Sequence, residues 1–331
     1  GLFWSTVYSD GRVENYLTYT PGGTVTPVVR FGDVVTSRET LTDAAADLEA
    51  GGLRVAGGVN GDYYVVSTGV PLGVVITDGV LRSWAPGYEA VAFRADGTAF
   101  VGEPDLTVTM DTGTAICQIA AVNKIRSPGG IYLFTSDFSE TTGNTLPGVD
   151  VILSTGDDLT VGGLVSATVV EVLEGTQATA LSEGQMVLSV NSASDPALAE
   201  TLRSLAPGSI VSLSVSSDDS AWRDAKEAVG GLYRLLKDGE VQSGLENEFA
   251  PRTAVGIRPD GTVILYTVDG RQPGYSIGAM MTMVANRLQE LGCTEAMCLD
   301  GGGSTTLAAT IPGDDGASLI DSPSGGYQRA N

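Results

Sequence analysis

The chain has 331 residues, of which 42% are hydrophobic, enough for the core of one large domain or of two smaller ones. Its formal net charge is −22, so its electrostatic field repels nucleic acid and anionic membranes. Histidine is absent, which excludes Ser-His-Asp and Cys-His catalysis and leaves acid–base chemistry to carboxylates, tyrosines, water or the substrate.

The first part of the chain predicts short strands followed by a helix. Apolar and polar residues alternate at 3–8, 15–20 and 25–30, and turn residues separate these runs, so we expect three strands. Apolar residues at helical spacing follow at about 39–50, and the Gly51-Gly52 pair predicts the end of that helix.

The run at 53–59 resembles a buried strand and ends in Asn60-Gly61-Asp62. Asn-Gly is a strong signal for a hairpin turn, but the residues that follow do not look like a simple return strand. Clearer hairpins are predicted farther along the chain, around Asp78-Gly79 and Asp96-Gly97.

Strand signals dominate from about 105 to 215, which predicts a β-rich insertion or subdomain. The expected strands are 106–110, 131–135, 149–154, 164–173, 186–190 and 210–215. A helix is predicted at about 196–205 within this segment. A second helix is expected to begin at Ser220 and to end at Gly230-Gly231.

The last third of the chain predicts a strand at 232–236, a hairpin over 253–268 and a polar loop at 269–276. A helix over 277–291, capped by Ser276, precedes a strand that ends at Asp300. The predicted fold class is therefore α+β, with mixed, largely antiparallel sheets, a few flanking helices and a β-rich middle segment.

The cysteines, the lack of a long apolar run and the first residue give expectations about metal binding, disulfides and the location of the protein. Cys117, Cys293 and Cys298 form no C-x-x-C pair, which argues against zinc; Cys293 and Cys298 could form a disulfide or serve as small buried apolar residues. No apolar run is long enough to cross a bilayer, so we expect no membrane insertion. The chain begins at Gly1 without methionine, so we expect that a signal peptide or anchor has been left out, and an extracellular or cell-surface location.

Six motifs occur in one order along the chain and together resemble the phosphodiester glycosidase domain family. They are Asn60-Gly-Asp-Tyr-Tyr64, Ala228-Val-Gly-Gly231 with Leu236-Lys-Asp-Gly239, Pro251-Arg-Thr-Ala-Val-Gly256, Asp269-Gly-Arg-Gln272, Leu299-Asp-Gly-Gly-Gly-Ser304 and Ser324-Gly-Gly-Tyr-Gln-Arg329-Ala-Asn331. The resemblance covers residues 51–331, and residues 1–50 are expected to complete the same domain with its first strands and helix.

The resemblance implies a mixed α+β domain that hydrolyses sugar-1-phosphodiesters, as in the removal of N-acetylglucosamine from a phosphodiester link. It also implies that the Asn-Gly-Asp, Arg-Thr, Asp-Gly-Arg and Asp-Gly-Gly-Gly-Ser segments meet at one pocket. The implied catalytic residues are Asp300, Asp62 and Arg252. The implied substrate-binding residues are Asn60, Gly61, Asp269, Arg271, Gly301, Gly302, Gly303, Ser304, Thr305 and Arg329.

These residue types suit a phosphodiester. Glycine amides at a strand end can approach a phosphate oxygen closely, and the Ser304 and Thr305 hydroxyls add donors. Arg252 and Arg271 offer bidentate contacts to phosphate against the acidic field of the chain, although each could also be a solvated surface ion pair. The lysine and the spacing of a nucleotide P-loop are absent.

Glycosidic cleavage usually needs two carboxylates, and Asp62 and Asp300 each follow an apolar strand beside a glycine. We expect Asp300 to act as base or nucleophile with Asp62 as its partner, although either could simply anchor its loop. No cofactor is assigned, and a divalent cation between the carboxylates stays open. Tyr63 and Tyr64 could stack on a sugar, with at least one of them in the core.

The favoured function is a hydrolase acting on sugar phosphodiesters of phosphoglycans, cell-wall polymers or exopolysaccharides. One alternative is a carbohydrate- or wall-binding module without turnover. Another is a metal-dependent phosphodiesterase that cleaves the P–O bond rather than the C–O bond.

Overall fold

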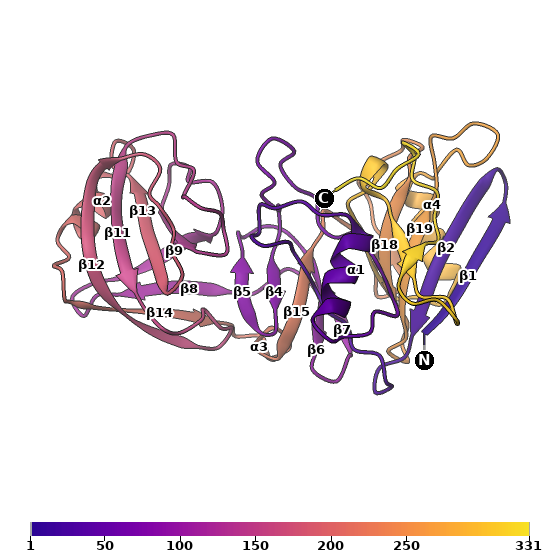
Figure 1. Ribbon diagram of the computed structural model, residues 1–331, viewed down its shortest axis with the longest axis horizontal. Coiled ribbons are helices and arrows are strands. Elements are labelled where there is room, and N and C mark those ends of the chain that lie inside the picture. Colours follow the sequence, from indigo (N-terminus) through magenta and orange to yellow (C-terminus); the bar gives the residue numbers. More distant parts are fainter. Residues whose placement is uncertain (1, 331) are drawn as a thin grey trace.

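The computed structural model describes residues 2–330, so Gly1 and Asn331, the outer ends of the predicted domains, lie outside the described residues. The molecule is elongated, with a closed barrel at one end and the two chain ends in the other half (Figure 1). A five-stranded sheet lies between the barrel and a seven-stranded sheet (Figure 1).

The seven-stranded sheet is antiparallel throughout. In spatial order its strands are β1 (Leu2–Ser9), β2 (Arg12–Tyr19), β19 (Val263–Val268), β18 (Arg252–Ile257), β20 (Glu295–Leu299), β16 (Tyr233–Lys237) and β17 (Glu240–Val241). The central strand β18 is buried along its whole length, because it has a partner strand on each edge and apolar side chains on both faces.

The barrel closes from seven strands. Around the barrel they are β10 (Ile131–Thr135), β13 (Gln185–Asn191), β11 (Gly148–Ser154), β12 (Leu164–Thr176), β14 (Ile210–Ser216), β8 (Thr107–Asp111) and β9 (Ile116–Val122). Their inward side chains, such as Val151, Leu188 and Leu213, are fully buried in one apolar core. Closure leaves no free edge strand, which removes a route to aggregation.

Two smaller sheets connect these parts. The five-stranded sheet runs β5 (Val80–Ser83), β4 (Val75–Thr77), β15 (Ala225–Gly230), β6 (Ala90–Arg94) and β7 (Ala99–Gly102). A three-stranded sheet runs β22 (Ser318–Leu319), β21 (Leu307–Ala309) and β3 (Gly57–Val59). Strand β3 and the strand after the glycine run are therefore neighbours, although about 250 residues separate them in sequence.

The helices are short, and each packs one face on a sheet. They are α1 (Leu41–Ala50), α2 (Pro196–Arg203), α3 (Ser220–Arg223) and α4 (Met281–Glu290). Helix α4 buries Val284, Ala285 and Leu288 against the seven-stranded sheet, as its apolar stripe predicts. Within residues 2–330 no helix has the length and apolar character needed to cross a membrane.

The observed fold is mostly antiparallel β with few helices, which agrees with the coarse prediction. The hairpin at Asp78-Gly79 is confirmed, with φ angles of 50° and 78°, and so are the hairpins of β6–β7 and β18–β19. Every strand expected between 105 and 215 is present, together with β9, which the sequence prediction missed. The division of the chain into domains stays a prediction.

Two predicted elements are wrong, and the start of a third is misplaced. Residues 25–30 form no strand; they belong to a loop that Glu227 anchors by accepting the Val29 N–H at 2.8 Å. The helix expected from Ser220 to Gly231 ends after one turn, and its second half is strand β15, which pairs with both β4 and β6. Pairing on both edges satisfies the backbone and outweighs the helical spacing.

The last helix begins four residues later than predicted. Gly278 has a φ of 92°, which an α-helix does not allow, so α4 starts at Met281. The Ser276 hydroxyl caps nothing; it donates to the Asp269 carbonyl at 2.5 Å and accepts the Val13 N–H at 3.1 Å. Gly292 ends the helix as predicted, with a φ of 89°.

The three cysteines are free, and Cys293 and Cys298 are buried. Of the two alternatives for this pair, packing as small apolar residues is therefore the correct one. Cys293 lies under the backbone of Gly256, where an added Cβ would come within 2.6 Å of its sulfur.

Candidate functional site

One edge of the seven-stranded sheet gathers the predicted motifs. Because β18 runs antiparallel to both β19 and β20, its first residue, Arg252, lies beside the ends of those two strands. Asp269 directly follows β19, and Asp300 directly follows β20. Strand pairing therefore brings together three motifs, although Asp269 lies 17 residues and Asp300 lies 48 residues after Arg252 in the sequence.

Asn60 ties this edge to the three-stranded sheet. Its amide nitrogen donates to the Asp300 carbonyl at 2.7 Å, and its amide oxygen accepts from the Thr253 hydroxyl at 2.7 Å and from the Thr306 N–H at 3.1 Å. The side chain is buried, and Gly61 accepts the Asp300 N–H at 3.0 Å. This geometry favours a positioning role for Asn60 over direct contact with a substrate.

We therefore expect Asn60→Ala to lower the free energy of unfolding by about 3 kcal/mol, because three partners, two of them on buried residues, lose their hydrogen bonds. The variant should also lower any turnover, since Asp300 loses a support. Urea unfolding of the variant and of Asn247→Ala, an exposed control, measures the effect. Equal stability of the two variants would show that the Asn60 network contributes little.

Asp300 starts a tight loop over Gly301–Gly303 that includes the 3₁₀ turn η1 (Gly302–Ser304). One carboxylate oxygen of Asp300 accepts the Gly301 N–H at 2.8 Å. Burial raises the pKa of Asp300, while the Ser304 hydroxyl, the Gly301 N–H and the charge of Arg329 oppose the rise. Asp300 and the three glycines are half-buried, so the loop can be reached from solvent.

Only part of this loop is free to bind an anion. Three backbone N–H groups of the loop already have acceptors. That of Gly301 donates to the Asp300 carboxylate, that of Gly302 to the Pro251 carbonyl at 2.9 Å, and that of Ser304 to the Gly301 carbonyl at 3.1 Å. The Gly303 N–H has no protein acceptor among the described residues. The Thr305 hydroxyl is buried and has no partner within residues 2–330. Of the three glycine N–H groups that were predicted to bind a phosphate oxygen, that of Gly303 is the one left without a protein acceptor in the described chain.

Asp62 lies next to this loop with its carboxyl group buried. Its Oδ2 accepts the Gly73 N–H at 2.6 Å and packs against Gly230, where an added Cβ would lie 2.6 Å away. Its Oδ1 is buried and has no hydrogen-bond partner in the described chain. Burial raises the pKa of Asp62, and the charge of Asp300 adds to the increase.

Lys124, which lies in none of the six sequence motifs, supports Asp62 from the barrel side. Its buried ammonium donates to the carbonyls of Pro71 at 2.5 Å and Gly73 at 2.7 Å. Burial lowers the pKa of Lys124, and the nearby charge of Asp62 opposes the change. Gly73 therefore contacts both members of a buried acid–base pair, which holds the loop around Asp62 in place.

The predicted arginines differ in the hydrogen bonds and ion pairs that they form with the protein. Arg252 is buried, pairs with Glu246 at 2.8 Å and also donates to the carbonyls of Glu248 and Ala279. Its guanidinium is therefore largely occupied by the protein. The alternative role for Arg252 was a solvated ion pair at the surface; the observed pair with Glu246 involves a buried guanidinium, and the catalytic role of Arg252 stays a prediction.

Arg271 and Arg329, unlike Arg252, have guanidinium groups without protein partners in the described chain. Across residues 2–330 neither makes an ion pair or a hydrogen bond with a protein group. An added Cβ at Gly302 would lie 3.1 Å from Nη1 of Arg271, and one at Gly303 would lie 3.6 Å from Nη1 of Arg329. Arg271 also adopts a φ of 57°, uncommon for a residue with a side chain. Two uncommitted guanidinium groups thus flank the loop after Asp300.

Two residues before Arg271, Asp269 forms a pair of buried carboxylates with Asp321, which lies outside the six sequence motifs. Asp269 accepts from the Tyr275 hydroxyl at 3.0 Å and the Ser322 N–H at 3.1 Å, and Asp321 accepts from the Leu307 N–H at 2.8 Å. Burial raises the pKa of Asp269 to about 6 and that of Asp321 to about 7, and the charge of Asp269 contributes to the second shift.

These shifts predict how stability depends on pH. Asp321 has an ordinary pKa of 3.8 and a folded pKa of about 7, so between these values the folded state binds a proton that the unfolded state has released. Its stabilising effect is present below pH 3.8 and is lost as the pH rises through about 7.

We expect Asp321→Asn, which keeps the acceptor for Leu307, to raise the free energy of unfolding at pH 8 by about 2 kcal/mol and to change little near pH 4. Urea titrations at both pH values, with the exposed Asp315→Asn as control, measure this difference. A gain that is the same at both pH values would contradict the assignment.

The two tyrosines after Asp62 point to different surroundings, as the alternation predicts. The Tyr63 hydroxyl contacts the buried Cys298 sulfur at 3.7 Å. The Tyr64 ring lies beside two guanidinium groups, 5.3 Å from Arg38 and 5.7 Å from Arg329. The Tyr64 ring therefore borders the anion-binding side of the site, while Tyr63 lies near enough to Asp300 and Arg252 to be affected by their charges.

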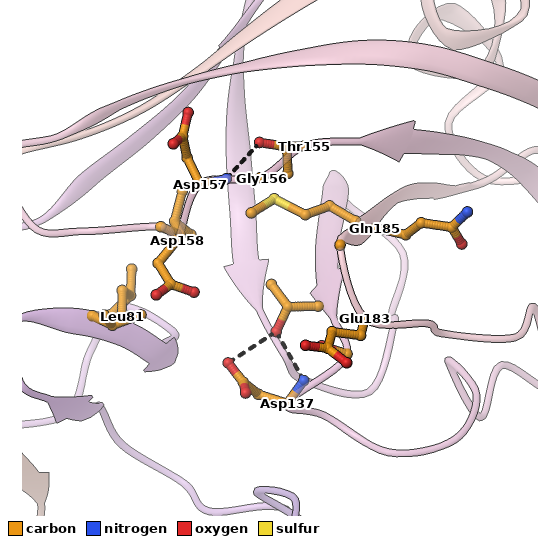
Figure 2. Close-up of a pocket in the computed structure, with 14 residues that line it drawn as sticks. Leu81, Asp137, Thr155, Gly156, Asp157, Asp158, Glu183 and Gln185 are labelled. Atoms are coloured by element: carbon orange, nitrogen blue, oxygen red, sulfur yellow. Dashed lines mark hydrogen bonds between the residues drawn. The ribbon is translucent and has the colours of Figure 1, made fainter.

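Of two pockets in the described part of the chain, only one contains predicted site residues. A pocket of about 310 Å³ lies beside the barrel, where the side chains of Asp137, Asp158 and Glu183 line it (Figure 2). It contains none of the predicted site residues. A smaller pocket of about 150 Å³ contains Asn60, Gly61 and Asp62, so we take the smaller one as part of the candidate site.

No residues can be named for a divalent cation. Within the described chain no group of three or more His, Cys, Asp or Glu side chains is arranged to hold a metal ion.

Comparison with known proteins adds a family assignment. The family model described as phosphodiester glycosidase matches residues 161–330, just over half of the chain. A Bacillus subtilis (strain 168) protein described as SPbeta prophage-derived uncharacterized protein YomE is 40% identical over 102 residues, which are 29% of this chain and 15% of that protein.

Two solved structures share the fold. A hypothetical protein from Synechocystis has a TM-score of 0.76 and 20% identity, covering 100% of this chain and 60% of its own. A protein of Burkholderia pseudomallei K96243 that is described as exported has a TM-score of 0.66 and 19% identity, covering 95% of this chain and 71% of its own. This chain thus spans less than two thirds of the prophage and Synechocystis proteins.

Proposed function

This chain belongs to the phosphodiester glycosidase family, and from that premise we propose that it is a hydrolase that cleaves the glycosidic bond of sugar-1-phosphodiesters. The substrates we propose are phosphodiesters of N-acetylglucosamine or a similar sugar in phosphoglycans, cell-wall polymers or exopolysaccharides. The observation that carries the proposal is the pair of unpaired guanidinium groups, Arg271 and Arg329, over the glycine loop beside Asp300.

The large negative net charge of the chain is the reason why the unpaired Arg271 and Arg329 indicate an anion-binding site. The chain has 18 lysines and arginines against 40 acidic residues, and within residues 2–330 eight of the fifteen arginines pair with a carboxylate. Two arginines that stay unpaired at one loop form a local positive site in a negative field. A phosphodiester carries one charge and two free oxygens, which two guanidinium groups can bind.

In the proposed reaction, the bond between the anomeric carbon and the phosphate oxygen breaks, and the phosphate leaves with the bonding electrons. A phosphate monoester is a weak base, so it needs less protonation than a sugar alcohol would. Water supplies the oxygen that ends on the anomeric carbon, and Asp300 accepts the proton of that water or first attacks the carbon itself.

Asp62 is the proposed partner carboxylate. Burial raises its pKa, so it holds a proton more readily than an exposed aspartate does and can act as the acid when Asp300 acts as the base. Lys124 and Gly73 hold Asp62 in position, while Asn60 holds the backbone of Asp300.

An aryl phosphodiester of N-acetylglucosamine tests the reaction. We expect release of the free sugar, and in ¹⁸O-labelled water we expect the label on the sugar. Label on the phosphate would show P–O cleavage by a phosphodiesterase, and binding without turnover would show a carbohydrate-binding module; either result would overturn the proposal.

We also propose that the protein works outside the cell or at its surface. The support is compositional, since a chain with three lysines and a net charge of −22 suits that setting. Fractionation of cells that express the native gene, with detection by antibody, tests this location; a purely cytoplasmic signal would overturn it.

A further inference from the structure

The pocket of about 150 Å³ is lined in part by a segment that contains none of the predicted site residues. The end of β3 and Asp62 line one part of the pocket, and the loop at 29–40 together with α1 lines another part. Arg38 holds this loop over the site, because its guanidinium donates to the Val66 carbonyl and lies 5.3 Å from the Tyr64 ring.

The polar atoms of the pocket lack partners. Asp62 Oδ1 and the Tyr64 hydroxyl are both buried, and neither has a hydrogen-bond partner in residues 2–330. Buried polar atoms are nearly always hydrogen-bonded, so two such atoms lining one pocket indicate a polar occupant. Glu39 and Arg30, an ion pair at 3.3 Å, add further donors and acceptors to the same wall.

Size and composition indicate which occupant fits. An apolar cavity of about 150 Å³ accepts a six-membered ring such as benzene. Here Val35, Leu41 and Val59 supply apolar wall, but carboxylates and hydroxyls interrupt it. A ring that carries hydroxyl groups on an apolar frame matches this mixture better than a hydrocarbon does.

The pocket is also connected to the anion site. Tyr64 belongs to both, since its ring lies 5.7 Å from Arg329, the guanidinium beside Gly303, while its hydroxyl is buried in the pocket lining. Asp62 connects them as well, because it lines the pocket and feels the charge of Asp300. A ligand with a ring in the pocket would place its phosphate near the two arginines.

We infer that this pocket binds the pyranose ring of the substrate, and that the Tyr64 hydroxyl and the Glu39 carboxylate hydrogen-bond to hydroxyl groups of the ring. The inference rests on the proposed function, because it supplies the sugar half of the sugar-1-phosphodiester. It assigns Tyr64 and Glu39 to sugar recognition and leaves the phosphate to Arg271 and Arg329.

Calorimetric titration with two phosphate monoesters tests the inference. The probes are glucose 1-phosphate, which has a ring, and methyl phosphate, which lacks one. We expect the intact protein to bind glucose 1-phosphate about tenfold more tightly, the gain from one or two hydrogen bonds. Tyr64→Phe and Glu39→Gln should each reduce this preference about threefold to tenfold and leave the Kd for methyl phosphate unchanged.

A pocket-filling variant makes the test independent of single hydrogen bonds. Ala44 lies on α1 and lines the pocket, and leucine is a good helix former, so Ala44→Leu should fold and occupy the space. It should abolish the preference for the ring. Ala46→Leu, an exposed position on the same helix, is the matched control and should keep the preference.

The outcomes separate the two proposals. Equal binding of both probes to the intact protein, or binding of neither, would overturn the ring pocket, and so would a preference that survives Ala44→Leu. If the ring preference is present but the aryl phosphodiester is not hydrolysed, the pocket stands and the proposed function fails. If hydrolysis occurs but Ala44→Leu has no effect, the function stands and the pocket holds only water.

Discussion

Asp300→Asn is expected to lower kcat for the sugar phosphodiester by about 10²–10⁴-fold, with little change in KM. Asparagine has the same shape and its side-chain oxygen can still accept the Gly301 N–H, so the loop should keep its conformation. What the variant removes is the negative charge that accepts a proton or attacks the anomeric carbon. Steady-state kinetics with the aryl phosphodiester of N-acetylglucosamine measures the change.

A second readout distinguishes catalysis from loop support. The charge of Asp300 raises the pKa of Asp62, so removing it should shift the titration that is due to Asp62 to lower pH in any residual activity. Because the pKa of Asp300 is itself raised on folding, the variant should be at least as stable as the parent at neutral pH. Asp314→Asn, at an exposed position nearby in the sequence, is the control. Undiminished turnover in a folded Asp300→Asn protein would sink the catalytic role.

Removing both guanidinium groups of the anion site, Arg271→Met with Arg329→Met, is expected to lower kcat/KM by about 10²–10⁴-fold. A hydrogen bond to a charged group contributes about 1.5–3 kcal/mol, or roughly one to two powers of ten for each arginine. Neither side chain holds another residue of the described chain by a hydrogen bond or ion pair, so the loss should fall on the substrate rather than on stability. Kinetics of the single and double variants measures the effect.

The double-mutant cycle shows whether the two arginines bind one group. The loss of about 10²–10⁴-fold is the sum of two independent losses, and the double variant should fall short of that sum if both arginines contact the same phosphate, because the first removal lets the phosphate move. Lysine at either position should restore only part of the activity, since an ammonium group cannot form the bidentate contact. Arg54→Met, an exposed arginine with no ion pair among the described residues, controls for the change in net charge. Full activity in the double variant would remove the basis of the anion site.

Local sequence was sufficient wherever a single residue type is nearly obligatory. The Asp78-Gly79 hairpin, the Gly292 helix end and the β18–β19 hairpin were predictable because their positive φ angles favour glycine or aspartate. Six of the seven barrel strands were predictable from their apolar alternation, whereas β9 and the closure that joins β10, β9 and β8 were not. Closure depends on pairing between strands that are far apart in sequence.

The wrong elements fail for the same non-local reason. The stretch after Ser220 has helical spacing, but β4 and β6 offer it a hydrogen-bonding partner on each edge, and the chain becomes β15. The start of α4 is set by close packing of Gly278 against the backbone of Ala250, where an added Cβ would lie 2.5 Å away. The helix or strand propensity of one segment gives no information about the strands and backbone groups that pack against it in the folded protein.

For the site, the sequence by itself determined which segments carry the chemistry: the Asp62 and Asp300 carboxylates, the glycine loop, and Arg271 and Arg329 stand in recognisable motifs. The tertiary structure alone decided what each residue is free to do. Asn60 and Arg252 have their polar groups bonded within the protein, whereas Arg271 and Arg329 do not. Lys124 and Asp321 lie in no motif and enter only because the fold buries them beside Asp62 and Asp269. The physical reason is that residue type is local, whereas burial and the identity of a hydrogen-bond partner depend on strands that meet only after folding.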